Sequence, residues 1–241
     1  MGTVHTTRTV VTGKSGSGKS TYAGKLIAHQ RAFGHVEQVI IVNRKTEHAD
    51  LCEARWTVTG EGNPRDQIVG RDSVFFHVVA PDPKPFVEKL CRSLLEFRFP
   101  RLIVFDEAQN FTKRGAVADA LLRVNLEGRD ALLNALYVTP LVKGANSGVD
   151  LSILDQSTHM TVFRTQGEGN LSRIYEDEFF PELKNQAHKL AMPHGGPSEY
   201  ATKNRDTNEA VAMLRTQQSD GRFSLYPKDI TQEAEGGAFQ E

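Results

Sequence analysis

The sequence contains little cysteine, no excess of charge and no long apolar run. Its two cysteines, Cys52 and Cys91, lie far apart and form no C-x-x-C motif, which excludes a disulfide framework and is typical of a reducing compartment. The net charge is −1, with 29 Lys and Arg against 30 Asp and Glu, so no global field steers the chain toward nucleic acid. No stretch approaches the roughly 18 apolar residues of a membrane-spanning helix, and the first residues form no apolar signal segment. We therefore expect neither secretion nor membrane insertion.

The eight histidines never cluster at the spacing of metal ligands, which argues against a histidine metal site. The remaining composition is ordinary for a globular domain, with 39% hydrophobic and 24% charged residues. A chain of 241 residues can bury one sizeable core. We expect an α/β domain over residues 1–193 and a partly disordered C-terminal extension over residues 194–241, with a short helix at Glu209–Gln217 and disorder in the last dozen residues.

The most informative stretch is Gly13–Ser20, which fits the phosphate-loop pattern G-x-x-x-x-G-K-[ST] at every fixed position. Its three glycines allow a tight turn whose N–H groups point at a phosphate. Lys19 would reach the β- and γ-phosphates of ATP, and the Ser20 hydroxyl would coordinate Mg²⁺. The predicted nucleotide-binding residues are Gly13, Lys14, Ser15, Gly16, Ser17, Gly18, Lys19, Ser20 and Thr21.

The residues on either side of this loop support the same interpretation. Thr9–Thr12 is a short β-branched run typical of a buried strand, and residues 20–33 have a helical pattern that Gly34 ends. The positive N-terminal end of that helix would face the anion. A Gly/Ser-rich linker, the alternative interpretation, requires neither the lysine nor this strand–loop–helix frame.

Buried strands alternate with helices along most of the chain. Strand patterns cover residues 38–42, 73–79, 102–105, 135–139 and 160–164, and helical patterns cover residues 86–95, 116–126 and 149–154. Residues 43–70 are polar and broken by Gly and Pro, so we expect short irregular elements there. The pattern predicts an α/β fold of the RecA-like P-loop NTPase class, with a mainly parallel sheet covered by helices on both faces.

A second motif follows the strongest strand, Leu102–Phe105, which ends in Asp106 and Glu107. An apolar strand ending in Asp-Glu is typical of a Walker B motif, in which the Asp holds Mg²⁺ beside the phosphate loop. Glu107 can act as the general base that polarises the attacking water. The alternative interpretation is that Asp106 and Glu107 are ordinary surface charges after a core strand. With the phosphate loop upstream, the pair indicates hydrolysis of ATP rather than binding alone.

A third feature is the strand at residues 135–138, which ends in Thr139 and follows Gly128-Arg129-Asp130. A polar residue at that strand end can contact the attacking water or the γ-phosphate, and Arg129 could project into a neighbouring subunit's site as an arginine finger. Alternatively, Thr139 caps the turn before Pro140 and Arg129 is a surface charge. Three further arginines compete for the finger role: Arg123, Arg164 and Arg173.

With these motifs the chain resembles the FtsK–HerA superfamily of ring ATPases and, within it, the small genome-packaging ATPases of viruses and phages with double-jelly-roll capsids. The resemblance covers roughly residues 8–175 and rests on Gly-Ser-Gly-Lys-Ser in the phosphate loop, Ile103–Glu107 and Gly128-Arg129. The family usually has Gln at the strand-end sensor position, whereas this chain has Thr139, which puts the sensor assignment in doubt but not the ATPase.

This resemblance implies a hexameric ring that pumps double-stranded DNA into a preformed capsid, with Arg129 acting across the subunit interface. It also implies capsid vertex or portal proteins as partners, and a location in the host cytoplasm or at the packaging vertex of the virion. The basic stretches Lys113–Gly115 and Lys143–Asn146 are candidate DNA-contacting loops, although both could equally be ordinary solvated loops.

Other ATPase classes compete with this assignment. The string Asp106–Asn110 is similar to helicase boxes and to PhoH-like proteins, but the chain lacks a second RecA-like domain with its arginine-rich motif, and a PhoH-like protein would end its next strand in Gly-Asp. An assembly or secretion ATPase of the zonula-occludens-toxin type would usually carry a transmembrane segment. A small-metabolite kinase would need lid arginines and an acceptor pocket, and a protein that binds nucleotide without turnover would need a silent Glu107.

Overall fold

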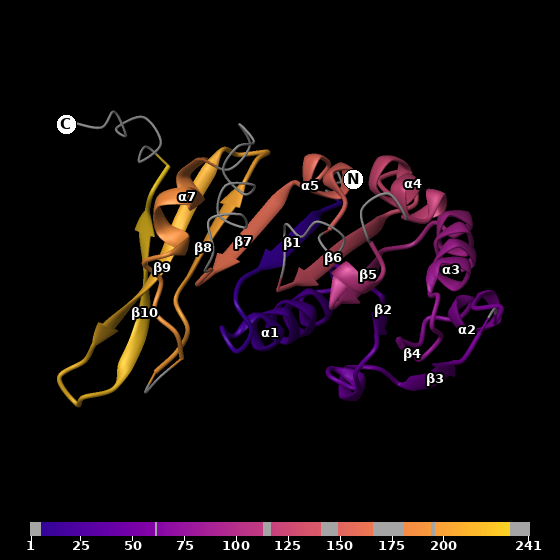
Figure 1. Cartoon of the computed structure of the whole chain (residues 1–241), viewed down its shortest axis with the longest axis horizontal. Coiled ribbons are helices and arrows are strands. Elements are labelled where there is room, and N and C mark those ends of the chain that lie inside the picture. Colours follow the sequence, from indigo (N-terminus) through magenta and orange to yellow (C-terminus); the bar gives the residue numbers. More distant parts are fainter. Residues whose placement is uncertain are drawn as a thin grey trace.

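The computed structural model describes residues 6–60, 62–112, 117–140, 149–165, 181–193 and 196–231. These residues build one ten-stranded sheet in the order β10-β9-β8-β7-β1-β6-β5-β2-β4-β3, with helices on both faces (Figure 1). The strands from β3 to β7 in that order all run parallel, and β8, β9 and β10 continue the sheet as an antiparallel meander. None of the described helices is long and apolar enough to cross a membrane.

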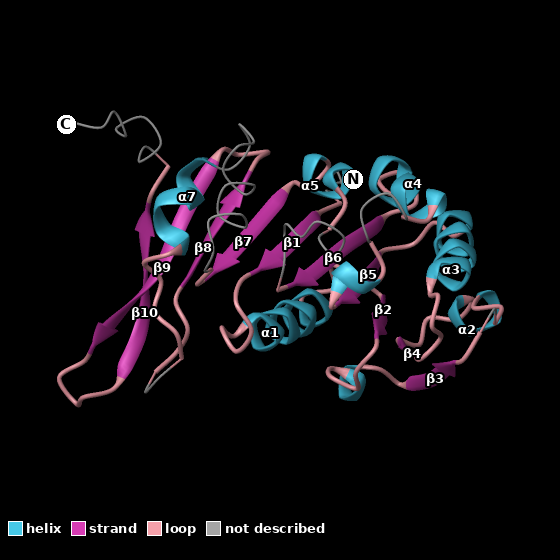
Figure 2. Cartoon of the chain, in the orientation of Figure 1, coloured by secondary structure: helices cyan, strands magenta, loops and turns pink. Residues whose placement is uncertain are grey.

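The parallel strands are β1 (Arg8–Thr12), β2 (Gln38–Asn43), β3 (Ala54–Val58), β4 (Val74–Val78), β5 (Arg101–Asp106), β6 (Leu133–Thr139) and β7 (His159–Phe163). The antiparallel strands are β8 (Tyr200–Asn204), β9 (Glu209–Gln217) and β10 (Phe223–Asp229). The helices are α1 (Lys19–Ala32), α2 (Arg65–Ile68), α3 (Lys84–Glu96), α4 (Asp119–Glu127), α5 (Leu151–Asp155) and α7 (Pro181–Ala187), with short 3₁₀ turns at Ala49–Leu51 and Ala108–Asn110. Figure 2 shows how the helices flank the strands.

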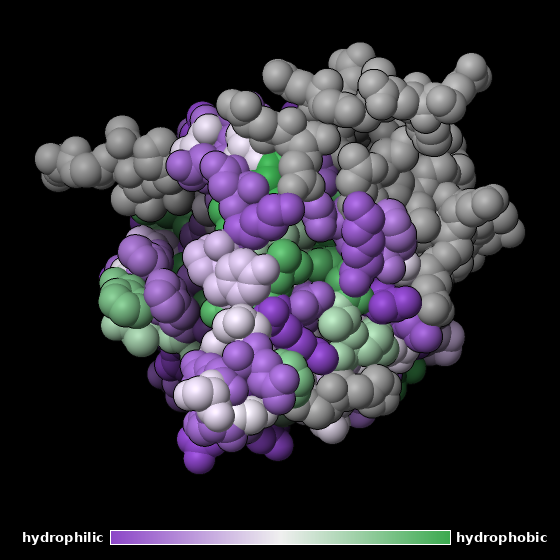
Figure 3. Space-filling model, turned by 90° about the vertical axis from the view of Figure 1, so that its left-hand side faces the viewer, coloured by the Kyte–Doolittle hydropathy of each residue, from purple (hydrophilic) through white to green (hydrophobic). Residues whose placement is uncertain are grey.

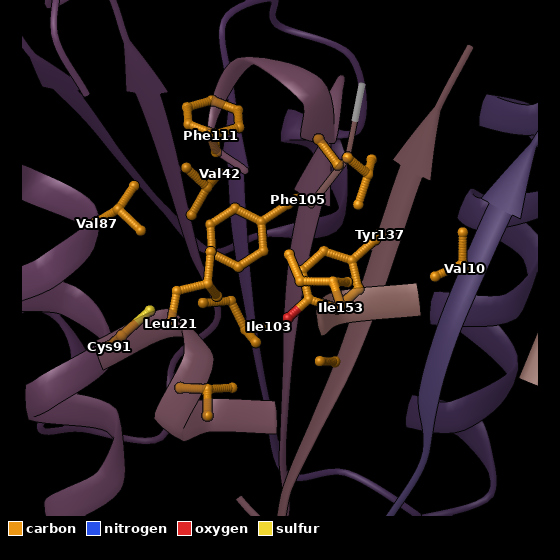
Figure 4. Close-up of a cluster of buried hydrophobic side chains, with 14 of the residues drawn as sticks. Val10, Val42, Val87, Cys91, Ile103, Phe105, Phe111, Leu121, Tyr137 and Ile153 are labelled. Carbon is orange, nitrogen blue, oxygen red and sulfur yellow. The ribbon is translucent and has the colours of Figure 1, made fainter. Parts of the chain in front are cut away.

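The central strands are apolar because both of their faces are covered. All five residues of β1 are buried. Within this strand the adjacent residues Val10 and Val11 point to opposite faces of the sheet and contribute to two different apolar clusters. On one face α3 and α4 close a cluster in which the rings of Phe105 and Tyr137 stack with centroids 5.6 Å apart (Figure 4). On the other face α1 contributes Ile27. The predicted fold class, a mainly parallel sheet with helices on both faces, is confirmed.

The helix predicted at Glu209–Gln217 is wrong, because these residues form strand β9. Ala, Met, Leu and Gln favour a helix locally, but Ala210 and Ala212 are buried alternately with more exposed neighbours, and β9 pairs with β8 on one side and β10 on the other. Tertiary pairing therefore overrides local propensity. The division at residues 193/194 stays a prediction, while the strands beyond it extend the same sheet. The disorder predicted for the last dozen residues concerns mostly residues 232–241, which lie outside the described part.

The expectation of irregular structure throughout residues 43–70 is also wrong, since β3 lies within that segment. This strand is an edge of the sheet and pairs only with β4 in the described structure. Its residues Arg55, Trp56 and Thr57 are exposed, so the strand has no apolar pattern that the sequence could reveal. At the opposite end of the sheet, the surface near β9 and β10 mixes hydrophilic and hydrophobic residues (Figure 3).

Candidate active site

Most of the predicted nucleotide-binding and metal-binding residues line a cavity of about 770 Å³ at the carboxyl ends of β1, β5 and β6. In parallel α/β sheets ligands bind at this edge, because loops that leave the carboxyl ends of neighbouring strands converge there. The cavity is lined by Gly18, Lys19 and Ser20 from the phosphate loop and by Asp106 and Glu107 from the end of β5. The phosphate loop and the Walker B pair are therefore brought together, as the sequence predicts.

The phosphate loop needs glycine for two different reasons. A Cβ added to Gly13 would lie 2.6 Å from the Cβ of Phe163, so only glycine fits beside β7. Gly18 has a φ of 100°, a left-handed conformation that L-residues with side chains rarely adopt. The backbone N–H of Lys14 donates to the carbonyl oxygen of Arg164 at 2.8 Å, which ties the loop to the chain that follows β7.

Lys19 lies inside the loop, with 8% of its surface exposed. Its Nζ donates to the carbonyl oxygen of Lys14 at 2.9 Å. Burial lowers the pKa of Lys19, and the carboxylates of Glu107 and Asp106 oppose this shift by favouring the charged ammonium. The nearby carboxylates keep the buried ammonium of Lys19 charged, so it can pair with the phosphates of a nucleotide bound on the loop.

Asp106 is buried and held in a fixed orientation. Its Oδ1 accepts from the backbone N–H of Glu107 at 3.0 Å, and its Oδ2 accepts from Nδ2 of Asn43 at 3.0 Å. The Nε2 of His48 lies 3.8 Å from the same Oδ2. Burial raises the pKa of Asp106, while His48 and the N–H of Glu107 counteract that shift. A bound cation would therefore favour the ionised carboxylate of Asp106.

Ser20 supplies the other predicted metal ligand, and its Oγ donates to Oε2 of Glu47 at 3.4 Å. A hydroxyl and carboxylates around one cavity are the hard oxygen donors that Mg²⁺ prefers. The donor set formed by Ser20, Asp106 and the neighbouring Glu47 thus fits Mg²⁺ in its chemistry.

Glu107 sits in a strained backbone conformation, with a φ of 55°. Its Oε1 accepts from Nζ of Lys45 at 2.8 Å, and its Oε2 accepts from Nε2 of Gln109 at 2.5 Å. Partial burial opposes ionisation, but these two hydrogen bonds outweigh it, so the pKa of Glu107 lies below its usual range. The carboxylate is therefore ionised and able to accept a proton at neutral pH.

Thr139 lies at the buried end of β6, and its Oγ1 donates to Oε1 of Gln109 at 3.0 Å. The same Gln109 side chain donates to Glu107, so a single amide links the strand-end threonine to the carboxylate of Glu107. The resemblance leads us to expect a Gln at the strand end. Here Thr139 occupies that end, and a Gln reaches the same region from the 3₁₀ turn after β5.

Arg129 lies before the amino end of β6, at the end of the strand away from the cavity. It is exposed in the turn between α4 and the amino end of β6, while Thr139 ends that strand at the cavity. Six residue steps of about 3.3 Å separate the two ends of β6 by about 20 Å. Arg129 therefore cannot reach the nucleotide site of its own chain.

The competing arginines already have partners within the described structure or lie outside it. Arg123 donates twice to the carboxylate of Glu127, at 2.8 Å each, and Arg164 donates to the carbonyl oxygen of Leu190 at 3.2 Å. Arg173 and the two basic stretches proposed for DNA contact, residues 113–115 and 143–146, lie outside the described residues.

Sequence reasoning missed the contribution of the last residue of β2 and of the segment after it. Asn43, Lys45, Glu47 and His48 contact Asp106, Glu107 or Ser20, yet no motif marks them. One usable signal was topological, since β2 pairs with β5 and a polar residue that ends β2 must lie beside Asp106. Gln109 was visible only as part of a helicase-like string.

Comparisons with known proteins agree with this geometry. A family model described as an AAA domain matches residues 4–140. The genome packaging NTPase B204 from Sulfolobus turreted icosahedral virus 2, in complex with AMP, has a TM-score of 0.68 and 18% identity over 86% of this chain and 96% of that chain. Its complex with ATP-gammaS gives a TM-score of 0.67 and 17% identity over the same shares.

A third similar structure is B204, the DNA-packaging ATPase from Sulfolobus turreted icosahedral virus, with a TM-score of 0.65 and 15% identity over 85% of this chain and 95% of that chain. No curated protein sequence matches this chain. At these identities the likeness shows the fold, and at that level the predicted resemblance to viral genome-packaging ATPases is confirmed.

Proposed function

This chain belongs to the AAA domain family, and on that premise we propose that it is an ATP-hydrolysing motor that translocates double-stranded DNA into a viral procapsid. One observation carries the hydrolysis: the phosphate loop, Asp106 and Glu107 line one cavity. The fold shared with the B204 packaging NTPases supports the packaging role.

In this proposal ATP lies on Gly13–Thr21, and Lys19 neutralises its terminal phosphates. Ser20 and Asp106 would hold Mg²⁺, which when bound supplies charge neutralisation at the phosphate oxygens. Glu107 accepts the proton of the attacking water. Each of its oxygens accepts one hydrogen bond within the described structure and keeps a further lone pair for that water.

In this proposal Gln109 and Thr139 together act as the sensor that responds to the bound nucleotide. The amide of Gln109 contacts Glu107 and Thr139 together, so a shift of the carboxylate toward water or phosphate must change the contact at the end of β6. We therefore assign the sensor role to the pair rather than to Thr139 alone.

The position of Arg129 favours an assembly. Because it lies about 20 Å from its own site along β6, a finger role for this residue requires a neighbouring subunit. A hexameric ring that contacts duplex DNA and docks on capsid vertex or portal proteins would meet this requirement, in the host cytoplasm or at the packaging vertex. Because the chain has a net charge of −1, any DNA contact in this proposal would have to come from a local basic surface or from assembly into a ring.

The test is the rate of ATP hydrolysis without nucleic acid, with blunt duplex DNA and with single-stranded DNA, using Lys19→Ala as the blank. Stimulation by duplex alone supports a packaging translocase. Stimulation mainly by single strands or RNA favours the helicase-like or PhoH-like alternative. An equal rate of hydrolysis in all three conditions leaves an ATPase, such as one of the zonula-occludens-toxin type, and contradicts the DNA motor.

A further inference from the structure

His48 contacts the candidate site but has no role in the proposed hydrolysis. It lies between β2 and the 3₁₀ turn Ala49–Leu51, behind the residues that line the cavity. Its backbone has a φ of 67°, a left-handed conformation that residues with side chains adopt infrequently. Such a conformation persists where the surrounding structure holds it, so the contacts of the ring show what this residue is held against.

One side of the His48 ring faces Asp106. The Nε2 atom lies 3.8 Å from Oδ2 of Asp106, and the side chain is only 13% exposed. Within the described part of the chain, this buried Nε2 forms no hydrogen bond. A buried polar atom without a partner carries a cost in free energy. A shift of about 1 Å would bring the two atoms within hydrogen-bonding distance.

The other side of the ring faces α1. A Cβ added to Gly24 would lie 3.3 Å from both Cε1 and Nδ1 of His48, which is closer than an ordinary contact. Gly24 lies inside α1, where glycine is less favourable than alanine. This glycine therefore leaves the space that the ring occupies, and the ring lies between α1 and the carboxylate of Asp106.

We propose that His48 is a positioning residue for Asp106, which holds the carboxylate in the orientation that binds Mg²⁺. The inference rests on the proposed function, because it concerns the same Mg²⁺–ATP site. Asn43 donates to Oδ2 of Asp106 from the end of β2, and the backbone N–H of Glu107 donates to Oδ1. His48 adds a contact from the side of α1. Groups that orient a metal ligand typically contribute about 10- to 100-fold in metal affinity.

The same ring connects Asp106 with the phosphate loop. The loop follows β1 and Asp106 ends β5, and these two strands are not neighbours, because β6 lies between them. Helix α1 begins at Lys19, directly after Gly18 of the loop. A ring packed against both α1 and Asp106 therefore sets the distance between the two halves of the site, which direct pairing of β1 with β5 does not set.

The test measures Mn²⁺ binding to the full chain in the presence of ADP by electron paramagnetic resonance, because Mn²⁺ takes the same oxygen ligands as Mg²⁺. His48→Leu is expected to weaken Mn²⁺ binding about 10- to 100-fold. Metal-free ADP binding, measured by calorimetry in EDTA, should stay unchanged. His48→Gln keeps a polar group at the end of the side chain and should recover most of the loss. His29→Leu is the matched control, because His29 is exposed on α1.

A second set of variants tests the packing of the ring on α1. Gly24→Ala adds the Cβ that the ring excludes, so it should change Mn²⁺ affinity when His48 is present. Combined with His48→Ala, the same substitution should leave Mn²⁺ affinity unchanged. In that background it should raise the melting temperature, because alanine favours a helix more than glycine does.

Three results overturn the positioning role. They are unchanged Mn²⁺ binding in His48→Leu, a loss in His48→Gln equal to that in His48→Leu, and an effect of Gly24→Ala that is the same with and without the ring. In each case the proposed function stands if the wild-type chain binds ADP more tightly with Mn²⁺ than without it. A wild-type chain that binds no nucleotide, or binds it independently of metal, overturns the proposed function itself.

Discussion

The buried ion pair between Lys203 of β8 and Glu182 of α7 allows a sharp test of how the C-terminal strands are attached. The charged atoms lie 2.5 Å apart, and the two side chains are only 6% and 5% exposed. Removing one partner leaves the other charge buried without its counter-ion, which typically costs about 3–5 kcal/mol. Replacing both partners by apolar residues removes the two desolvation costs together, and such replacements are often neutral or stabilising.

We therefore expect Lys203→Met to lower the melting temperature by about 6–10 °C. The entropy of unfolding is about 2.1 cal/mol/K per residue, or about 0.5 kcal/mol/K for 241 residues, so each kcal/mol corresponds to about 2 °C. Lys203→Met combined with Glu182→Leu should recover most of that loss. Differential scanning calorimetry measures all three proteins, and circular dichroism checks that each is folded.

The control is the exposed pair Arg123–Glu127 on α4, whose side chains are 56% and 48% exposed. Arg123→Met should shift the melting temperature very little, because exposed pairs are solvated and screened. If Lys203→Met shifts the temperature no more than Arg123→Met, or if the double variant is the least stable of the three, the argument from desolvation is wrong.

Three further predictions concern the chemistry. Glu107→Gln should lower kcat by about 10²- to 10⁴-fold in a phosphate-release assay, because it removes the general base, while ATP affinity measured by calorimetry changes little. Lys45→Met removes a donor that lowers the pKa of Glu107, so that pKa should rise and the acid limb of the kcat–pH profile should move to higher pH; an unmoved limb would refute the role of Lys45. Arg129→Ala should lower hydrolysis by about 10³-fold or more in assembled protein, and mixing it with Lys19→Ala should restore part of the rate, since one variant keeps an intact phosphate loop and the other keeps the arginine; no recovery in verified mixed assemblies would exclude action across the interface.

The parts of the fold that the sequence predicted are those where local pattern and tertiary burial agree. Strands β1, β2 and β5 are buried at every position, and their middle residues are apolar or β-branched because both faces of the sheet are covered there, so the sequence pattern reflects the burial. Strands β3 and β9 could not be predicted in this way. One is an exposed edge without an apolar pattern, and the other has helix-favouring residues whose strand form depends on pairing with β8 and β10.

The residues of the candidate site likewise fall into two groups, those that the sequence predicts and those that it does not. The residues in contiguous motifs, Gly13–Ser20 and Asp106–Glu107, were predictable because the chemistry fixes their spacing in the chain. Asn43, Lys45 and Gln109 were not, because their contacts with Asp106 and Glu107 arise from strand order and from the path of two short segments.

The parallel sheet also sets a length scale for any ring of the proposed kind. Within one chain the candidate nucleotide site and Arg129 lie at opposite ends of β6, so the number of residues in that strand sets the distance between them. Inserting or deleting one residue there would move Arg129 by about 3.3 Å relative to the site and would turn the β6 side chains on one side of the change to the other face of the sheet. Changes in the loops at either end of the strand would leave this distance almost unchanged, because the hydrogen-bond register of β6 with β1 and β5 fixes it.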